Sequence, residues 1–239
     1  MSGGVRPGIA RGASGDHGRA IVVTFHGIGD PWPGVPGGEL PYWCPAKEWP
    51  GFAETIADLQ QRSVTPLEVT FDDGNASDLE HGLPALVRCG VTATFFACAG
   101  RLGDRHFLSA ADLRSLRAAG MGIGSHGWAH TDLRRADDRE LGRAAEDSRA
   151  TLSDAIGEPV DRFAIPFGSY DRRVLRALRG YRAVYTSDQD RAQPDAWLVP
   201  RFSYTRAWTP DTLRRLASDT VPAAARLRRG LARAVKRLR

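Results

Sequence analysis

Residues 67–97, LEVTFDDGNASDLEHGLPALVRCGVTATFFA, contain two apolar runs on either side of an amphipathic segment. The runs at 67–71 and 92–97 have the length and the β-branched and aromatic content of buried strands. Between them, 78–89 has the periodicity of a helix, and Ser77 is a candidate N-terminal cap. A strand, a crossover helix and a second strand form a parallel βαβ unit. This stretch therefore predicts an α/β protein with a parallel sheet.

The same alternation extends over most of the chain. Further strands are expected at 21–26, 121–125, 162–167, 183–187 and 197–201, and further helices at about 52–62, 109–119, 137–156, 171–180 and 209–218. Seven strands that alternate with helices favour one parallel sheet, whose strands are buried on both faces. A chain of 239 residues is long enough to bury one core of barrel or sandwich size.

The composition excludes several classes of protein. With 42% hydrophobic and 26% charged residues, the chain is neither collagen, nor a coiled coil, nor wholly disordered. No run approaches the ~20 apolar residues of a membrane span, and no signal peptide is visible in the first twenty residues. Three cysteines without metal-like spacing favour a reducing compartment, so we expect a cytoplasmic protein.

The positive charge is concentrated in the last part of the sequence. Residues 223–239 carry seven Arg and Lys and no acid, which leaves 26 basic residues against 28 acidic ones elsewhere. We expect 1–19 to be a disordered lead-in, 20–221 to be the catalytic domain and 222–239 to form a basic amphipathic helix. Such a helix either packs on the domain or makes peripheral contact with an anionic membrane, which would make the protein membrane-associated. No module for binding nucleic acid is present, so nucleic acid is not an expected partner.

A long loop rich in Pro, Gly and Trp follows the first strand, at 27–50. Loops of this length inside a compact domain usually have a function. Its three tryptophans, Trp32, Trp43 and Trp49, are suited to stacking on a sugar ring.

Polar side chains follow the apolar strands at the points where the strands end. They are His26, Asp72 and Asp73, Ser125 and His126, Pro166–Phe167–Gly168, and Arg201. Because the carboxyl ends of parallel strands meet at one face of the sheet or barrel, we expect these groups to form the active site.

Two motifs among them have the chemistry of metal ligands. TFDDGN at 70–75 places two carboxylates side by side, so that one can bind a metal while the other faces a substrate, although Asp-Asp-Gly is also a turn signal. GSHGWAH at 124–130 holds two histidines four residues apart, as in helical metal-binding pairs, although such a pair is often structural. One carboxylate and two imidazoles make the three-ligand set of a catalytic zinc-type site with a position open for water.

TFDDG, SHGWAH and AIPFGSYD at 164–171, in this order and spacing, resemble the polysaccharide deacetylases of the NodB-homology type, carbohydrate esterase family 4. The resemblance covers about 20–215. It implies a distorted (β/α)7-8 TIM-like barrel, in agreement with the seven expected strands. The implied activity is hydrolysis of a linear amide C–N bond, which removes N-acetyl groups from an amino-sugar polysaccharide or glycan precursor and releases acetate.

The resemblance also implies roles for individual residues. Asp73, His126 and His130 would hold a divalent metal, usually Zn²⁺, and Asp72 would be the general base. A backbone N–H of the segment Pro166–Phe167–Gly168 would help to stabilise the oxyanion of the tetrahedral intermediate.

The chain departs from the commonest family pattern at two points. Ala164 stands where many members have an arginine, and no histidine follows His130, so the usual late histidine acid is missing. His26, in VTFHGIGD, resembles the first-strand motif of the branch that acts on exopolysaccharides such as poly-N-acetylglucosamine, and is our candidate acid. Arg201 is a candidate to replace the missing arginine by orienting Asp72 through a bidentate pair. Both residues also have purely structural interpretations.

Two other functions remain open on the same residues. The fold and metal site would also suit hydrolysis of a small amide or cyclic imide, because function depends on the site and not on the fold. The loss of the usual arginine and histidine would also suit a catalytically weak glycan-binding protein.

Overall fold

Eight parallel strands form one sheet in this computed structural model, which describes residues 18–218 and 235–236. The strands are β1 (Ile21–Phe25), β4 (Leu67–Phe71), β5 (Ala93–Ala97), β6 (Gly122–Ser125), β7 (Arg162–Ala164), β8 (Ala183–Thr186), β9 (Leu198–Pro200) and β10 (Phe202–Ser203). Their spatial order is β10-β1-β4-β5-β6-β7-β8-β9. Two short strands, β2 (Gly27–Ile28) and β3 (Trp43–Cys44), pair separately.

The last two strands close the sheet into a barrel. β9 pairs with β8 and β10 pairs with β1, and only Arg201 separates β9 from β10. The run 198–203 therefore connects the two edges of the sheet. The expected strand at 197–201 thus continues two residues further, and the predicted (β/α)7-8 barrel is confirmed.

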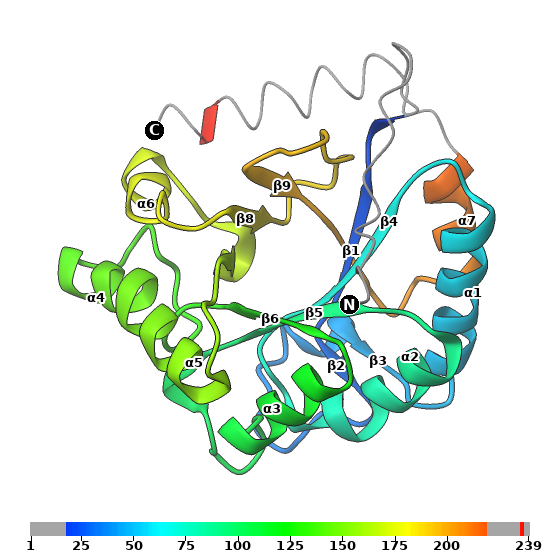
Figure 1. Cartoon of the computed structure of the whole chain (residues 1–239), viewed down its shortest axis with the longest axis horizontal. Helices are drawn as coiled ribbons and strands as arrows, with labels where there is room; N and C mark the ends of the chain where they lie inside the picture. Colours follow the sequence, from blue (N-terminus) through cyan, green and yellow to red (C-terminus); the bar gives the residue numbers. More distant parts are fainter. Residues whose placement is uncertain (1–17, 219–234, 237–239) are drawn as a thin grey trace, which may run out of the picture.

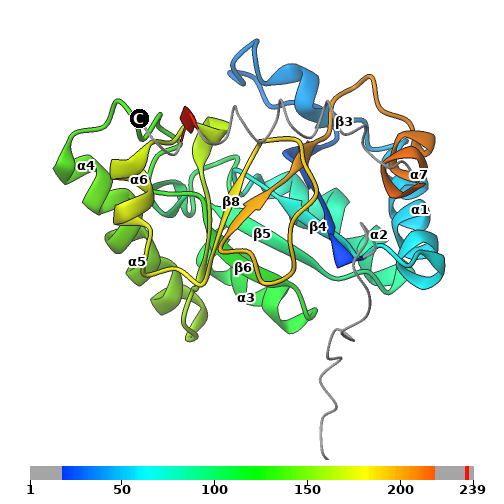
Figure 2. The ribbon, with the colours of Figure 1, turned by 90° about the horizontal axis from the view of Figure 1, so that it is seen from above.

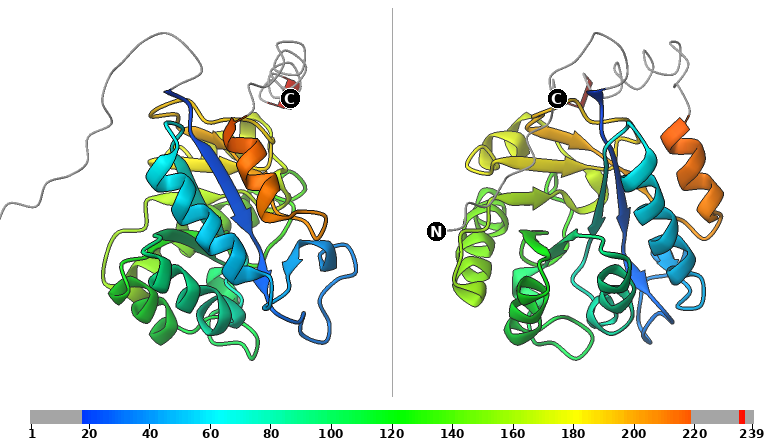
Figure 3. Two further views of the ribbon diagram at one scale, coloured as in Figure 1. Left: turned by 90° about the vertical axis from the view of Figure 1, so that its right-hand side faces the viewer. Right: turned by 45° about the vertical axis from the view of Figure 1, so that its right-hand side comes forward.

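Helices surround the strands and form an outer ring in the view of Figure 1. The α-helices are α1 (Trp49–Arg62), α2 (Leu83–Cys89), α3 (Ala110–Ala118), α4 (Asp138–Gly142), α5 (Ser148–Ile156), α6 (Arg172–Ala177) and α7 (Pro210–Ser218). α1 and α7 lie side by side on the outside of β1 (Figure 3). The segments at 27–48 project beyond one end of the barrel (Figure 2).

Side-chain alternation along β4 separates the two parts of the core. Leu67, Val69 and Phe71 point outward into the large apolar cluster beneath the helices. Thr70 and Asp72 point the other way, into the barrel, where both contact Arg201. We had expected the strands to be apolar on both faces. The barrel interior instead carries polar side chains near the carboxyl ends of the strands.

Local helix signals are partly confirmed. Ser109 caps α3 in a capping box with Asp112, as in the expected helix at 109–119. Ser77 makes no cap, because its backbone is already helical and the chain enters a π-helical turn at Asp78–Gly82. A second π-helical turn, Arg143–Asp147, connects α4 and α5, so the expected helix at 137–156 is one irregular segment.

The predictions for the two ends of the sequence fall almost entirely outside the described residues. The disordered lead-in at 1–19 meets them only at residues 18 and 19, and the basic helix at 222–239 only at 235–236. Both stay predictions. Within the described part of the chain, no helix is both long enough and apolar enough to span a membrane.

Candidate active site

A cavity of about 300 Å³ lies at the carboxyl ends of the strands. Its walls include the expected site residues His26, Asp72, Asp73, His126, His130 and Phe167, together with Glu39, Tyr42, Ile165, Ser187, Gln189, Ser203 and Thr205. A larger hollow of about 930 Å³ lies between α6 and the start of β9. Its walls are arginine and apolar side chains without acid–base or metal-ligand chemistry, so we assign the site to the smaller cavity.

Asp73, His126 and His130 form a cluster at the floor of this cavity. Asp73 Oδ1 lies 3.4 Å from His126 Nε2 and 3.3 Å from His130 Nε2, and the three ligand atoms lie within 4.8 Å of one another. Asp73 Oδ1 is buried and has no hydrogen-bond partner among the described residues. Because a buried, unpaired carboxylate oxygen is costly, two imidazole nitrogens around it fit a metal ion better than a polar contact.

The backbone of Ala164 orients one of these histidines. Its carbonyl oxygen lies 2.8 Å from His126 Nδ1, and since a carbonyl can only accept, Nδ1 carries the hydrogen. Nε2 is then the unprotonated nitrogen of the neutral ring, and it faces Asp73. A carbonyl that fixes the tautomer in this way is the usual outer partner of a metal-binding histidine.

Strained backbone is concentrated around the cavity. Among the described residues, five other than glycine have positive φ, and four of them line it: Asp73 (φ 74°), His130 (54°), Phe167 (58°) and Gln189 (51°). His126 and His130 thus lie on a turn after β6 and not on a helix, unlike the helical pairs to which we compared them. Such conformations cost about 1–3 kcal/mol each and are concentrated at functional sites.

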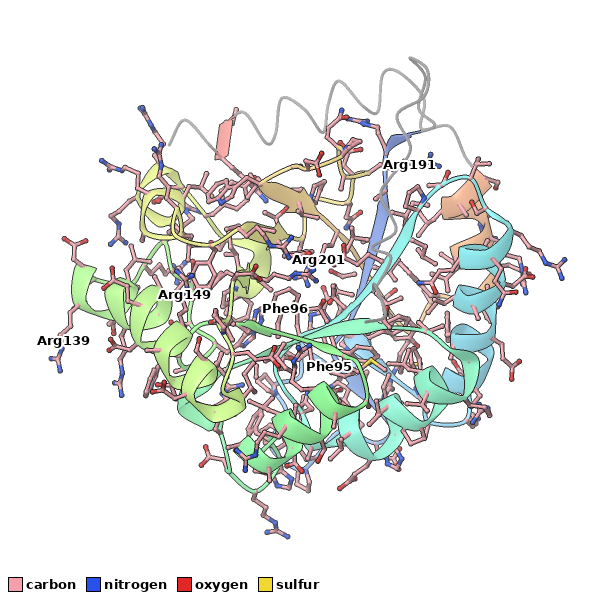
Figure 4. The ribbon with its side chains drawn as sticks, viewed as in Figure 1. Phe95, Phe96, Arg139, Arg149, Arg191 and Arg201 are labelled. Carbon is pink, nitrogen blue, oxygen red and sulfur yellow. The ribbon has the colours of Figure 1, made fainter. Side chains whose placement is uncertain are left out.

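Asp72 is held by Arg201 in a bidentate pair inside the barrel. Arg201 Nη1 donates to Asp72 Oδ1 at 2.7 Å and Nη2 donates to Oδ2 at 2.6 Å. The guanidinium also donates to Thr70 Oγ1 at 3.0 Å and to the carbonyl of Thr186 at 3.3 Å. Figure 4 shows Arg201 near the middle of the barrel, and its side chain is fully buried.

Arg201 packs against the inner apolar cluster that contains Ala164. Ala164 belongs to the inner apolar cluster that contains Phe96 and Tyr185. The guanidinium of Arg201 lies over these two rings, 5.5 and 5.7 Å from their centroids. Arg201, between β9 and β10, therefore lies in the barrel interior against the same cluster as the small Ala164 side chain.

The charges of the cluster shift its pKa values in different directions. Burial raises the pKa of Asp72, but Arg201 and His126 outweigh burial and lower it overall. Burial likewise raises the pKa of Asp73, and the neighbouring histidines lower it well below its ordinary value. Burial lowers the pKa of His130 to about 4. Burial lowers the pKa of His126, but Asp72 and Asp73 outweigh burial and raise it overall. Asp73 is therefore ionised and His130 is neutral near pH 7, as metal ligands must be.

His26 and Phe167 complete the cavity. His26 is half-buried, its ring lies 5.1 Å from that of Tyr42, and its Nδ1 has no hydrogen-bond partner among the described residues. Burial is the largest influence on the pKa of His26 and lowers it. The ring of Phe167 lies 4.3 Å from that of His130, and the N–H of Gly168 already donates to the carbonyl of Ile165. Since proline has no N–H, the N–H of Phe167 is the donor that this segment can offer a ligand.

Glu39 was not among the expected site residues, yet its Oε1 lies 3.7 Å from His130 Nδ1. It lies in the long loop at 27–50 but belongs to no motif. Of the three tryptophans in that loop, Trp43 and Trp49 are buried, so the expectation that they stack on a sugar is wrong. Trp49 begins α1 and donates to the carbonyl of Gly82, because this part of the loop packs into the core. Trp32 is half-buried and stacks on His106, with ring centroids 5.0 Å apart.

The chain is a parallel (β/α) barrel with one carboxylate and two imidazoles clustered at the carboxyl ends of its strands. A profile of the polysaccharide deacetylase family matches residues 60–185, more than half of the sequence. The chain therefore belongs to the polysaccharide deacetylase family. This confirms the family that the motifs predict.

Similar proteins agree with this assignment. YxkH of Bacillus subtilis, itself named only provisionally as a polysaccharide deacetylase, is 23% identical over 170 residues. The match covers 63% of this chain and 61% of YxkH, less than two thirds of that protein. The deacetylase PplD of Streptococcus pyogenes, solved with acetate, superposes with a TM-score of 0.73 at 16% identity, covering 84% of this chain and 99% of PplD. IcaB of Ammonifex degensii gives 0.66 at 22% identity, covering 84% and 96%. At these identities the two structures show a shared fold.

Proposed function

We propose that this protein removes N-acetyl groups from an amino-sugar polysaccharide or glycan precursor with the help of a divalent metal. The observation that carries the proposal is the geometry of Asp73, whose buried, unpaired Oδ1 faces Nε2 of both His126 and His130. One carboxylate and two imidazoles suit Zn²⁺ and leave a coordination position open. When bound, such a metal lowers the pKa of water and polarises a carbonyl.

Asp72 is suited to accept the proton of the attacking water. Its Oδ2 lies 4.0 Å from His126 Nε2, so the carboxylate borders the cluster without belonging to it. Arg201 occupies one lone pair on each of its oxygens, which leaves the second lone pair free to take a proton. The bidentate pair also prevents the carboxylate from rotating toward the cluster.

The N–H of Phe167 and the ring of His26 are suited to the other two tasks of the reaction. A backbone N–H at the cavity wall can donate to the oxyanion that develops from the acetamide carbonyl. The departing amine needs a proton, and His26 is the cavity-lining histidine outside the three clustered ligands, so it is the candidate donor.

Replacing His26 with Ala should lower kcat about 10²–10⁴-fold, the ordinary contribution of a general acid. The metal should remain bound, since His26 is not one of the three clustered ligands. Steady-state acetate release together with the metal content of the purified variant measures both quantities. His106→Ala is the matched control, because that ring lies outside the cavity against Trp32. An unchanged kcat in His26→Ala would assign the acid role to another group.

Replacing Asp73 with Ala should abolish tight binding of Zn²⁺, because it removes the oxygen that both imidazoles face. Isothermal titration of zinc into metal-stripped protein should give one site per chain for the wild type and none of comparable affinity for the variant. Asp154→Ala, at an exposed position of α5, should titrate like the wild type. Wild-type zinc affinity in Asp73→Ala would place the metal elsewhere.

The substrate class is tested by comparing two kinds of amide under the same conditions. The proposal expects acetate release from N-acetylglucosamine oligomers, including those of the poly-N-acetylglucosamine type, and little turnover of small linear amides or cyclic imides. The reverse preference would favour the small-amide hydrolase. Binding of the oligomers without any acetate release by the zinc-loaded protein would favour a glycan-binding protein.

A further inference from the structure

Lys236 is remote from the barrel in sequence but reaches the rim of the candidate active site. Its Nζ donates to Asp188 Oδ1 at 2.6 Å and to the carbonyl of Gly168 at 3.4 Å, across 48 and 68 residues of sequence. In Figures 1 and 2 the short red segment at 235–236 lies near the yellow part of the chain that carries α6.

The carboxylate of Asp188 is held in place for this contact by its own hydrogen bonds. Its side chain is only 4% exposed, and its Oδ2 accepts from the hydroxyls of Tyr170 at 2.7 Å and Thr186 at 2.9 Å. These two donors orient the carboxylate so that Oδ1 faces Lys236. The ammonium also lies 5.2 Å from the centre of the Tyr170 ring, within the range of a cation–π contact.

The two partners of Lys236 lie on the two segments that form one wall of the cavity. Phe167, Ser187 and Gln189 line the cavity. Gly168 directly follows Phe167, and Asp188 lies between Ser187 and Gln189. The segments approach closely at Gly168, where a Cβ atom would meet Ser187 Cβ at 2.9 Å and its backbone N at 3.0 Å. Lys236 therefore bridges the two segments next to a point where they lie in close contact.

Both segments hold strained backbone that needs support. Phe167 has φ 58° and Gln189 has φ 51°, values in the left-handed region that side chains other than glycine disfavour. Such conformations persist only where surrounding contacts hold them in place. The contacts from Lys236 to Gly168 and Asp188 are each one residue away from a strained position.

We propose that Lys236 is a positioning residue for the candidate active site. By pairing with Asp188 and Gly168 it fixes 166–168 against 187–189, and so holds the N–H of Phe167 where the oxyanion forms. Lys236 itself touches neither substrate nor metal ligands. The kinetic part of this inference rests on the proposed deacetylase function, whereas the contact with Asp188 does not.

The contact can be tested inside one molecule, because the chain has two lysines, Lys47 and Lys236. Lys47 is exposed and has no ion pair among the described residues, so it is the internal reference. In competitive acylation of the folded full-length chain, mass spectrometry should find Lys236 several-fold less reactive than Lys47. In Asp188→Asn the ratio should rise toward one. The same ratio in both proteins would overturn the contact.

The positioning role is tested by the kinetics of acetate release. Lys236→Ala should lower kcat about tenfold with little change in KM, since what is displaced is a group that acts in the transition state. Lys236→Arg should recover most of the loss, because a guanidinium can also pair with Asp188. Lys47→Ala should keep the wild-type kcat, and zinc stoichiometry should be unchanged in all three variants.

The role is overturned if Lys236→Ala keeps the wild-type kcat, or if Lys236→Arg recovers nothing. If the wild-type chain releases no acetate from any oligomer, the proposed function is wrong. The acylation ratio then still decides whether Lys236 pairs with Asp188.

Discussion

Asp72→Asn should lose about 10²–10⁴-fold in kcat for acetate release while it keeps one zinc per chain, because it removes the proposed general base and none of the three proposed metal ligands. Asparagine keeps Oδ1 as an acceptor for Arg201 Nη1, but its amide nitrogen cannot accept from Nη2, and the amide cannot take the proton of the attacking water. Acetate release at saturating oligomer and the metal content of the same sample are the two measurements.

Glu68→Gln is the matched control for this variant. Glu68 also lies on β4, and its carboxylate accepts from Tyr185 and not from Arg201. It should keep the wild-type kcat. If Asp72→Asn turned over like Glu68→Gln, Asp72 would not be the base.

Arg201→Met should destabilise the fold by about 3–5 kcal/mol, which is the usual cost of removing one partner of a buried ion pair. The variant leaves the carboxylate of Asp72 buried without its charged partner, and it removes the donors to Thr70 and Thr186. The midpoint of urea unfolding, followed by circular dichroism, measures the loss. The control is Arg182→Met, because Arg182 is exposed and pairs with Asp161. Arg191 is buried like Arg201, so it is less suitable.

Two further observations separate this explanation from a simple loss of packing. The double variant Arg201→Met/Asp72→Asn has no buried charge without a partner at this pair. Its loss of stability should therefore be smaller than the sum of the losses in the two single variants. The pKa of Asp72 is lowered in the folded wild type, so the pair stabilises the fold above the ordinary carboxyl pKa and loses this effect as the pH falls. The deficit of Arg201→Met should therefore shrink in acid. Strict additivity together with a deficit independent of pH would contradict the ion-pair account.

The barrel is predictable from the sequence because its strands are short apolar runs that alternate with helical periodicity. The closing strand is only partly predictable. Arg201 interrupts the run at 198–203 with a charge, so Phe202–Ser203 does not look like a strand until it pairs with β1. The expected strand at 162–167 is too long, since the chain turns at Pro166–Gly168, where Phe167 takes a positive φ.

The candidate site is also only partly predictable from the sequence. Asp73, His126 and His130 come from motifs whose residue types already indicate metal ligands. Glu39 and Gln189 carry no such signal, because only the closure of the barrel brings their segments to the same cavity. The composition of the long loop also does not predict the role of its tryptophans, because it does not distinguish an exposed ring from one that enters the core.

We propose that a metal held by Asp73, His126 and His130 serves the removal of N-acetyl groups. The most direct test is acetate release from N-acetylglucosamine oligomers by the full chain, before and after treatment with a chelator and again after one equivalent of Zn²⁺ is added back. We expect that acetate release by the wild type stops with the chelator and returns with zinc, and that it does not return in Asp73→Ala. Release at an undiminished rate from fully metal-stripped protein would contradict it.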